Sequence, residues 1–186
     1  MKRWATALLL LAIASPAFAC INTFASIFMD YKRAGDTEAM ASQLRYAEEA
    51  YRKHPTFENT NDLAVGLILS DRKEQGIKLL RDLERDKPGS AIVAANLGTA
   101  LELSSQDAEA LHWIREGVRR DPKEHFGSEW VHVKILEAKL ELKKNPDWLL
   151  HNSVLGWKVG DPPLVDEAGK PRLDVDVENA ISYQLN

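Results

Sequence analysis

The spacing of three prolines constrains the fold of this 186-residue chain more than any other feature of its sequence. Each proline follows a polar residue at the end of a stretch with helical hydrophobic periodicity: His54-Pro55, Lys87-Pro88 and Asp121-Pro122. The prolines are separated by 33 and 34 residues. Because proline ends a helix, and a fixed period of this length indicates repeated supersecondary units, the spacing predicts helix pairs stacked in series.

The residues between the prolines follow the same period. Counted back from Pro88, one repeat begins near Phe57, and counted back from Pro122 the next begins near Ala91. Small residues recur where the two helices of a pair must approach closely: Ala64 and Gly98 in the first helix, Gly76 and Ala110 in the second. A glycine costs up to about 1 kcal/mol inside a helix, so we expect close packing to explain both Gly76 and Gly117.

This pattern resembles the tetratricopeptide-repeat superfamily, whose 34-residue unit is a helix pair. The most specific fragment is Asn96-Leu97-Gly98-Thr99-Ala100-Leu101. The resemblance implies an all-α solenoid of about three repeats over residues 20–150, in which stacked pairs cover one another's apolar faces. We expect an irregular tail over 151–186, with a short hairpin within 164–175 and a last helix from near Asp176.

Weaker helical segments flank the two clear repeats. Asp36 is expected to cap a helix that runs to about Lys53, preceded by a shorter helix over 24–32. Ser128 is expected to cap another helix, which Asn145-Pro146 ends. The latter helix is apolar on two faces, which predicts that it lies between two neighbours.

The first nineteen residues have the three parts of an export signal. Lys2 and Arg3 precede an apolar run over 4–14, and Pro16 precedes the small-x-small triplet of residues 17–19. An apolar run this short cannot span a bilayer as a mature helix, which needs roughly 20 residues. The sequence therefore predicts a signal peptide over 1–19 and an exported protein.

Cys20, the single cysteine, follows the expected cleavage point. Two interpretations stand. The thiol receives a lipid, as in bacterial lipoproteins, and anchors the protein to the cell envelope; or an ordinary signal peptidase cleaves after Ala19 and the protein is periplasmic. The tripeptide Cys20-Ile21-Asn22 and the segment 128–140 are similar to a group of exported bacterial repeat proteins. That resemblance implies the fold and brings no activity with it.

Charge argues against nucleic acid as a partner. Without Lys2 and Arg3, 22 basic and 28 acidic residues remain, a net charge of −6. A mildly acidic chain with scattered basic residues has no electrostatic reason to bind nucleic acid or anionic lipid. Membrane contact is expected only through a lipid on Cys20.

The sequence contains no recognisable catalytic, cofactor or metal motif. The five histidines lack metal-binding spacing, and neither a nucleophile elbow nor a phosphate loop is present. We expect His132, on an apolar helix, to be a core histidine bonded to a backbone group. The alternative is a small exported enzyme or enzyme subunit with a site around His125, Glu129, His132 and His151.

The favoured hypothesis is a scaffold that binds a protein or peptide and uses no cofactor. In stacked repeats the first helix of each pair lines the concave side. That register predicts a partner-binding face formed by Asn61, Val65, Ile68, Leu69, Ile92, Asn96, Thr99, Leu103, Glu129 and Val133. The competing interpretation is that the chain's own tail, residues 152–175, covers this face.

Overall fold

The computed structural model describes residues 23–155, and it describes the side chains of 27–125 and 127–155. Over this range the chain forms helices and no strand, so the all-α prediction is confirmed there. The expected signal peptide, Cys20, the hairpin and the terminal helix lie outside the described residues. The helices are α2 (Thr23–Ala34), α3 (Thr37–Lys53), α4 (Phe57–Leu69), α5 (Lys73–Asp86), α6 (Ala91–Leu103), α7 (Asp107–Arg120), α8 (Glu124–Gly127), α9 (Glu129–Lys144) and the 3-10 helix η2 (Trp148–Leu150).

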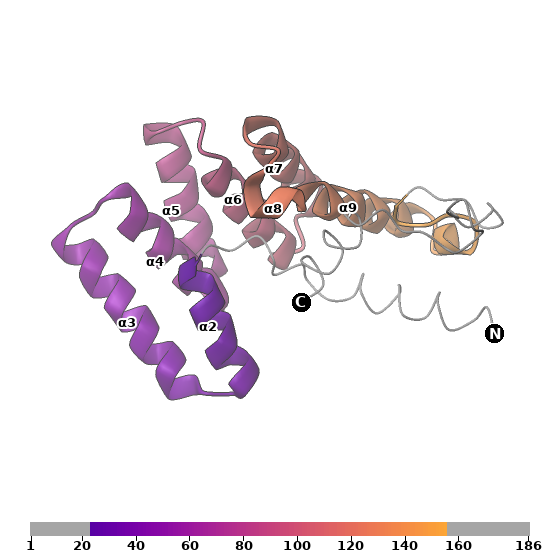
Figure 1. Ribbon diagram of the computed structural model, residues 1–186. Coiled ribbons are helices and arrows are strands. Elements are labelled where there is room, and N and C mark those ends of the chain that lie inside the picture. Colours follow the sequence, from indigo (N-terminus) through magenta and orange to yellow (C-terminus); the bar gives the residue numbers. More distant parts are fainter. Residues whose placement is uncertain (1–22, 156–186) are drawn as a thin grey trace, which may run out of the picture.

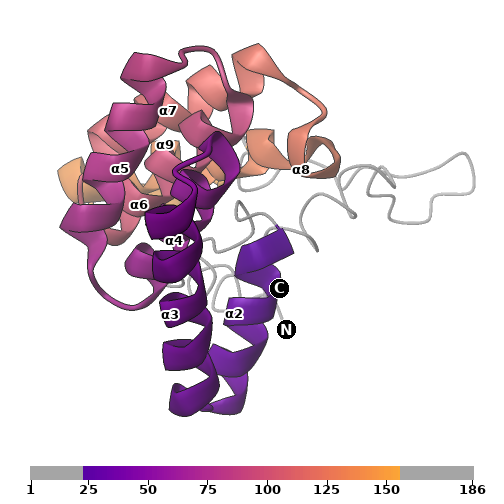
Figure 2. The ribbon, with the colours of Figure 1, turned by 90° about the vertical axis from the view of Figure 1, so that its left-hand side faces the viewer.

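Helices that follow one another along the chain pack against one another. The contacts run from α2 through α3, α4, α5 and α6 to α7, and α7 then packs on α9. Figure 1 shows this row from the α2–α3 pair to α9, and Figure 2 shows α2 and α3 lying side by side. In addition α2 contacts α4 and α4 contacts α6, so alternate helices form a second row of contacts.

The α4–α5 and α6–α7 pairs repeat each other with an offset of 34 residues. The first helix of each pair has 13 residues and the second has 14. The turn inside each pair contains one left-handed residue, Asp71 with φ 65° and Ser105 with φ 61°. Thr56 and Ser90 cap the first helices by accepting hydrogen bonds from backbone N–H groups three residues later. The 34-residue period of the sequence is thus also the period at which helix lengths, caps and turn angles repeat.

The predicted helix boundaries hold with one exception. The helices α3, α5 and α7 end one residue before the three polar residues that precede proline, and Asp36 caps α3 through the Ala39 N–H at 2.9 Å. Ser128 occupies the N-cap position of α9 but does not cap it, which corrects the expectation. Its hydroxyl instead donates to the His125 carbonyl at 2.8 Å, because the short helix α8 precedes it and Gly127, with φ 71°, turns the chain.

Close packing explains two helical glycines and not a third. A methyl group on Gly76 would lie 2.6 Å from the Ala64 carbonyl oxygen, and one on Gly98 would lie 2.5 Å from Ile114 Cδ1. A methyl group on Gly117 would have no neighbour nearer than 3.5 Å, which is ordinary van der Waals contact. The expectation that close packing requires Gly117 is therefore wrong.

The two apolar faces of α9 join two separate clusters, as predicted for a helix between neighbours. Leu136 packs into the main core formed by α4 to α7, and Val131, Ile135 and Ala138 pack against the segment that follows α9. None of the described helices has both the length and the apolar character needed to cross a membrane.

Candidate functional site

Charged side chains of alternating sign cross the interface of α9 with α6 and α7. Glu102 of α6 lies 2.7 Å from His132 Nε2 through Oε2 and 2.8 Å from Lys139 Nζ through Oε1. The same Lys139 ammonium lies 3.5 Å from Asp107 Oδ1 of α7, and Asp107 Oδ2 lies 2.8 Å from Lys143 Nζ. These residues tie three helices together through ion pairs.

The series continues from His132 towards α8. Glu129 Oε2 lies 3.8 Å from His132 Nδ1, and Glu129 Oε1 lies 2.5 Å from His125 Nδ1. His132 is 0% exposed, and Glu129 and Glu102 are also buried. We call the following residues the buried charge network, of which Lys143, at one end, is exposed: Glu102, Asp107, His125, Glu129, His132, Lys139 and Lys143. Buried charges are costly unless they are paired, and here each has a neighbour of opposite potential charge.

The two glutamates at its centre remain ionised in the folded protein. Burial by itself would raise the pKa of the Glu129 carboxyl, but hydrogen bonds and charge from His125 and His132 hold this pKa at about 2. Burial acts in the same way on Glu102, where His132 and then Lys139 outweigh it and lower the pKa. The His132 ring therefore contacts carboxylates rather than solvent.

The structure brings three of the four residues of the enzyme hypothesis together. His125, Glu129 and His132 are neighbours, but His151 lies at the end of η2, is exposed, and is not part of the network. His132 is buried as expected, and its ring contacts the carboxylates of Glu102 and Glu129. A bond from this ring to a backbone group remains a prediction. Within residues 23–155, no group of three or more His, Cys, Asp or Glu side chains is arranged to hold a metal ion.

Sequence reasoning missed the members that α6 and α7 contribute. Glu102 is the clearest case, because it is the one charged residue in α6 and occupies the position of Ile68 in the preceding repeat. A charge at a position that is apolar one repeat earlier indicates a buried ionic contact. Its partners lie 30 or more residues away in sequence, so periodicity alone could not name them.

The ten residues of the predicted partner-binding face fall into two groups. Asn96 Nδ2 donates to Asn61 Oδ1 at 2.9 Å in a buried contact between α6 and α4. Of the ten, Ile92, Leu103 and Val133 are half-buried, and the rest are buried: Asn61, Val65, Ile68, Leu69, Asn96, Thr99 and Glu129. Partner binding by this face remains a prediction.

The competing prediction, that residues 152–175 cover this face, falls mostly outside the described residues. Within the described part, Val154 is buried and packs with Leu149 against Val131, Ile135 and Ala138 of α9. None of these contacts involves a residue of the predicted partner-binding face. Coverage of that face by residues 156–175 remains a prediction too.

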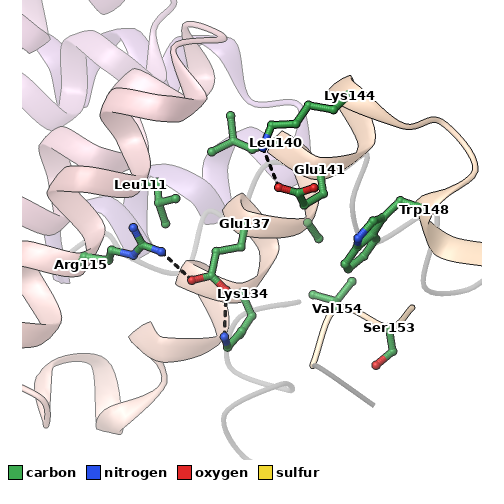
Figure 3. Close-up of a pocket in the computed structure, with 11 residues that line it drawn as sticks. Leu111, Arg115, Lys134, Glu137, Leu140, Glu141, Lys144, Trp148, Ser153 and Val154 are labelled. Carbon is green, nitrogen blue, oxygen red and sulfur yellow. Dashed lines mark hydrogen bonds and ion pairs between the residues drawn. The ribbon is translucent and has the colours of Figure 1, made fainter. Parts of the chain in front are cut away.

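A groove of about 430 Å³ opens between α7, α9 and the segment 148–154 (Figure 3). We call it the α7–α9 groove. Its apolar surface comes from Leu111, Ala138, Leu140, Trp148 and Val154. Its charged residues are Arg115, Lys134, Glu137, Glu141 and Lys144. The volume lies in the usual range of ligand sites, and sequence analysis had predicted none of these residues as site residues.

Ion pairs run along the groove. The Glu137 carboxylate accepts hydrogen bonds from Arg115 and Lys134, both at 2.8 Å, and Lys144 bonds Glu141 at 2.7 Å (Figure 3). Partial burial raises the pKa of Glu137, but Lys134 and Arg115 outweigh this and lower it. Three cations and two carboxylates therefore line the groove, which leaves it a positive charge in excess.

No protein-family model matches the sequence, and no curated protein matches it at a significant level. A functional hypothesis for this chain therefore depends on the arrangement of its own side chains. Two arrangements bear on this hypothesis: the repeated helix pairs with their buried charge network, and the open α7–α9 groove.

Proposed function

We propose that the protein is a tetratricopeptide-like scaffold of the cell envelope that holds a protein or peptide partner and catalyses no reaction. The observation that carries this proposal is the 34-residue repeat of the α4–α5 and α6–α7 pairs, which extends to helix lengths, caps and turn angles. Helix pairs of this period stack into solenoids, and solenoids expose long surfaces suited to binding other chains.

The chemistry of the polar residues supports a structural role for them. Enzyme sites require acids, bases or nucleophiles that a substrate can reach. In the buried charge network, Glu102, Glu129 and His132 bind one another out of contact with solvent. We assign this network to fixing α9 on α6 and α7.

The envelope location is part of the same proposal and rests on the sequence. Residues 1–19 have the composition of a signal peptide, and Cys20 follows them. The mass of the mature N-terminal peptide, isolated from cells that express the full gene, tests this step. A diacylglycerol adduct on Cys20 would place the protein on a membrane, an unmodified Cys20 terminus would leave it soluble in the periplasm, and an uncleaved chain would contradict export.

Capture experiments test the scaffold itself. The immobilised chain is exposed to envelope extract, and recovered proteins are compared with those from an Ile92→Glu variant by quantitative mass spectrometry. Ile92 is half-buried on the predicted partner-binding face and lies outside the core clusters, so the variant is expected to fold. Gln75→Glu, which makes the same charge change at an exposed site on α5, is the matched control.

We expect specific proteins to be recovered with the wild type and the Gln75→Glu control, and at least fivefold less with Ile92→Glu. Equal recovery by all three would contradict binding through the predicted face. Absence of any enriched protein would contradict the scaffold proposal as a whole.

A further inference from the structure

Within the described residues, α9 differs from the other helices that begin a pair. The helices α2, α4 and α6 each pack against a following helix of 14 residues or more. The helix α9 has 16 residues but is followed by η2, which has three. Its face at Val131, Ile135 and Ala138 is covered by short segments around Leu149 and Val154. A full-length helix would cover more of α9 than these residues do.

The α7–α9 groove is the part of this position that no helix of residues 23–155 covers. In the preceding pair, Gly98 of α6 lies directly beneath Ile114 of α7, and the flanking residues Ala94 and Leu101 are fully buried. On α9, Ala138 is one of the three residues that pack against the following segment. Lys134 and Glu141 flank Ala138 at the same spacing, four residues before and three after, and all three line the groove.

Arg115 indicates which side chain a helix at this position would present. One repeat earlier, Arg81 of α5 bonds Glu109 in the first turn of the next second helix, α7, at 2.8 Å. Arg115 lies 34 residues after Arg81, but within residues 23–155 no comparable helix follows α9. Its guanidinium bonds Glu137 instead, and its side chain is 56% exposed. The guanidinium is therefore available to an incoming carboxylate.

We propose that the α7–α9 groove binds an amphipathic α-helix of a partner protein, with an acidic residue in the first turn of that helix facing Arg115. Its apolar face would pack on Leu111, Leu140 and Trp148, in the manner of helix-in-groove recognition. This proposal rests on the proposed scaffold function and names a site and a partner class for it.

Three features favour a separate molecule over a permanent helix of the same fold. The charged residues Lys134 and Glu141 line the groove on either side of Ala138, whereas Ala94 and Leu101, at the same spacing around Gly98 on α6, are buried and apolar, so the groove surface is compatible with water. Polar, moderately sized surfaces are typical of reversible interfaces rather than of cores. The excess of cations in the groove also complements an acidic helix, and Leu150 next to Trp148 remains 61% exposed.

The probe is a fluorescein-labelled peptide of residues 107–120, the sequence of α7. It carries Glu109 and the apolar face that already packs on the helix before it. Its anisotropy is measured during titration with the full-length chain. We expect saturable binding, weakened at least fivefold by Arg115→Glu in the protein or by Glu109→Lys in the peptide. Combining the two changes should restore most of the binding.

Two further variants of the full chain keep the result interpretable. Arg119→Glu makes the same charge change on an exposed residue of the same helix and should leave binding unchanged. Arg115→Gln removes the charge without placing a second carboxylate beside Glu137, and it should weaken binding if Arg115→Glu proves unstable.

Three results would overturn the groove proposal: no saturable binding to the full chain, equal weakening by Arg115→Glu and Arg119→Glu, or a wild-type dimer that Arg115→Glu dissociates. The last would make a second copy of the chain the occupant. Capture of partners that depends on Ile92, without binding of the peptide, would contradict the groove proposal and leave the scaffold proposal intact. Failure of the capture experiment would contradict the scaffold proposal.

Discussion

Alanine at Gly76 and alanine at Gly117 should change stability in opposite directions. A methyl group at Gly76 would lie 2.5 Å from Ile68 Cγ1 and 2.6 Å from the Ala64 carbonyl oxygen. The isoleucine can rotate, but the carbonyl belongs to the backbone of α4, so α4 and α5 must separate. Overpacking costs up to about 3 kcal/mol, and alanine recovers about 1 kcal/mol of helix propensity. The net loss for Gly76→Ala is therefore about 2 kcal/mol.

At Gly117 the opposing contact is missing. The nearest atom would lie 3.5 Å from the new methyl group, so Gly117→Ala should gain up to about 1 kcal/mol. Urea unfolding, followed by far-UV circular dichroism, measures the stability change of each variant. With a slope near 2 kcal/mol/M, we expect the midpoint to fall by about 1 M for Gly76→Ala and to rise by up to about 0.5 M for Gly117→Ala. Equal destabilisation by both variants would refute the packing argument.

Three further variants test the polar interior. The folded pKa of Glu129, about 2, lies below its ordinary value of 4.5, so this carboxylate contributes about 3 kcal/mol to stability above pH 4.5 and loses that contribution as pH falls towards 2. The difference in unfolding free energy between the wild type and Glu129→Gln should therefore shrink between pH 4.5 and pH 2. A difference that stays constant over this range would contradict the argument. Arg120→Lys removes the paired hydrogen bonds from Arg120 to the Glu84 carboxylate of α5 and should cost about 1–2 kcal/mol in urea unfolding. The exposed Arg119→Lys control should leave the urea midpoint unchanged. Asn96→Ala should cost about 1–3 kcal/mol of stability because it removes the donor to the buried Asn61 Oδ1. Replacing both asparagines with leucine should cost less than that single change. A lower thermal midpoint for the double variant than for Asn96→Ala would contradict a paired contact.

The helix boundaries were predictable because local signals determine them. Proline cannot continue a helix, so His54, Lys87 and Asp121 mark three ends within one residue. Asp36 was identifiable as a cap because its hydrogen bond to the Ala39 N–H is also local. The prediction that Ser128 caps α9 was wrong because a serine caps a helix only when its backbone is extended. The turn at α8 gives Ser128 a helical backbone instead.

The interior charges and the groove were not predictable, because both depend on which side chains meet across helices. Glu102 and Lys139 are 37 residues apart, and no short motif joins them. Gly117 shows the same limit, since its sequence pattern suggested close packing and only the distance to its neighbours could decide. Arg115 was visible as one of many charged residues, and its similarity to Arg81 became informative only once the partner of Arg81 was known.

Because each helix packs mainly on those next to it along the chain, no single element holds all the others. Such a chain can open one unit at a time from its ends. Amide hydrogens should therefore exchange fastest in α2, which has neighbours on fewer sides, and slowest in α6, which lies between α4, α5 and α7. A partner that holds an end helix would slow exchange there first, well before it affected the middle of the array.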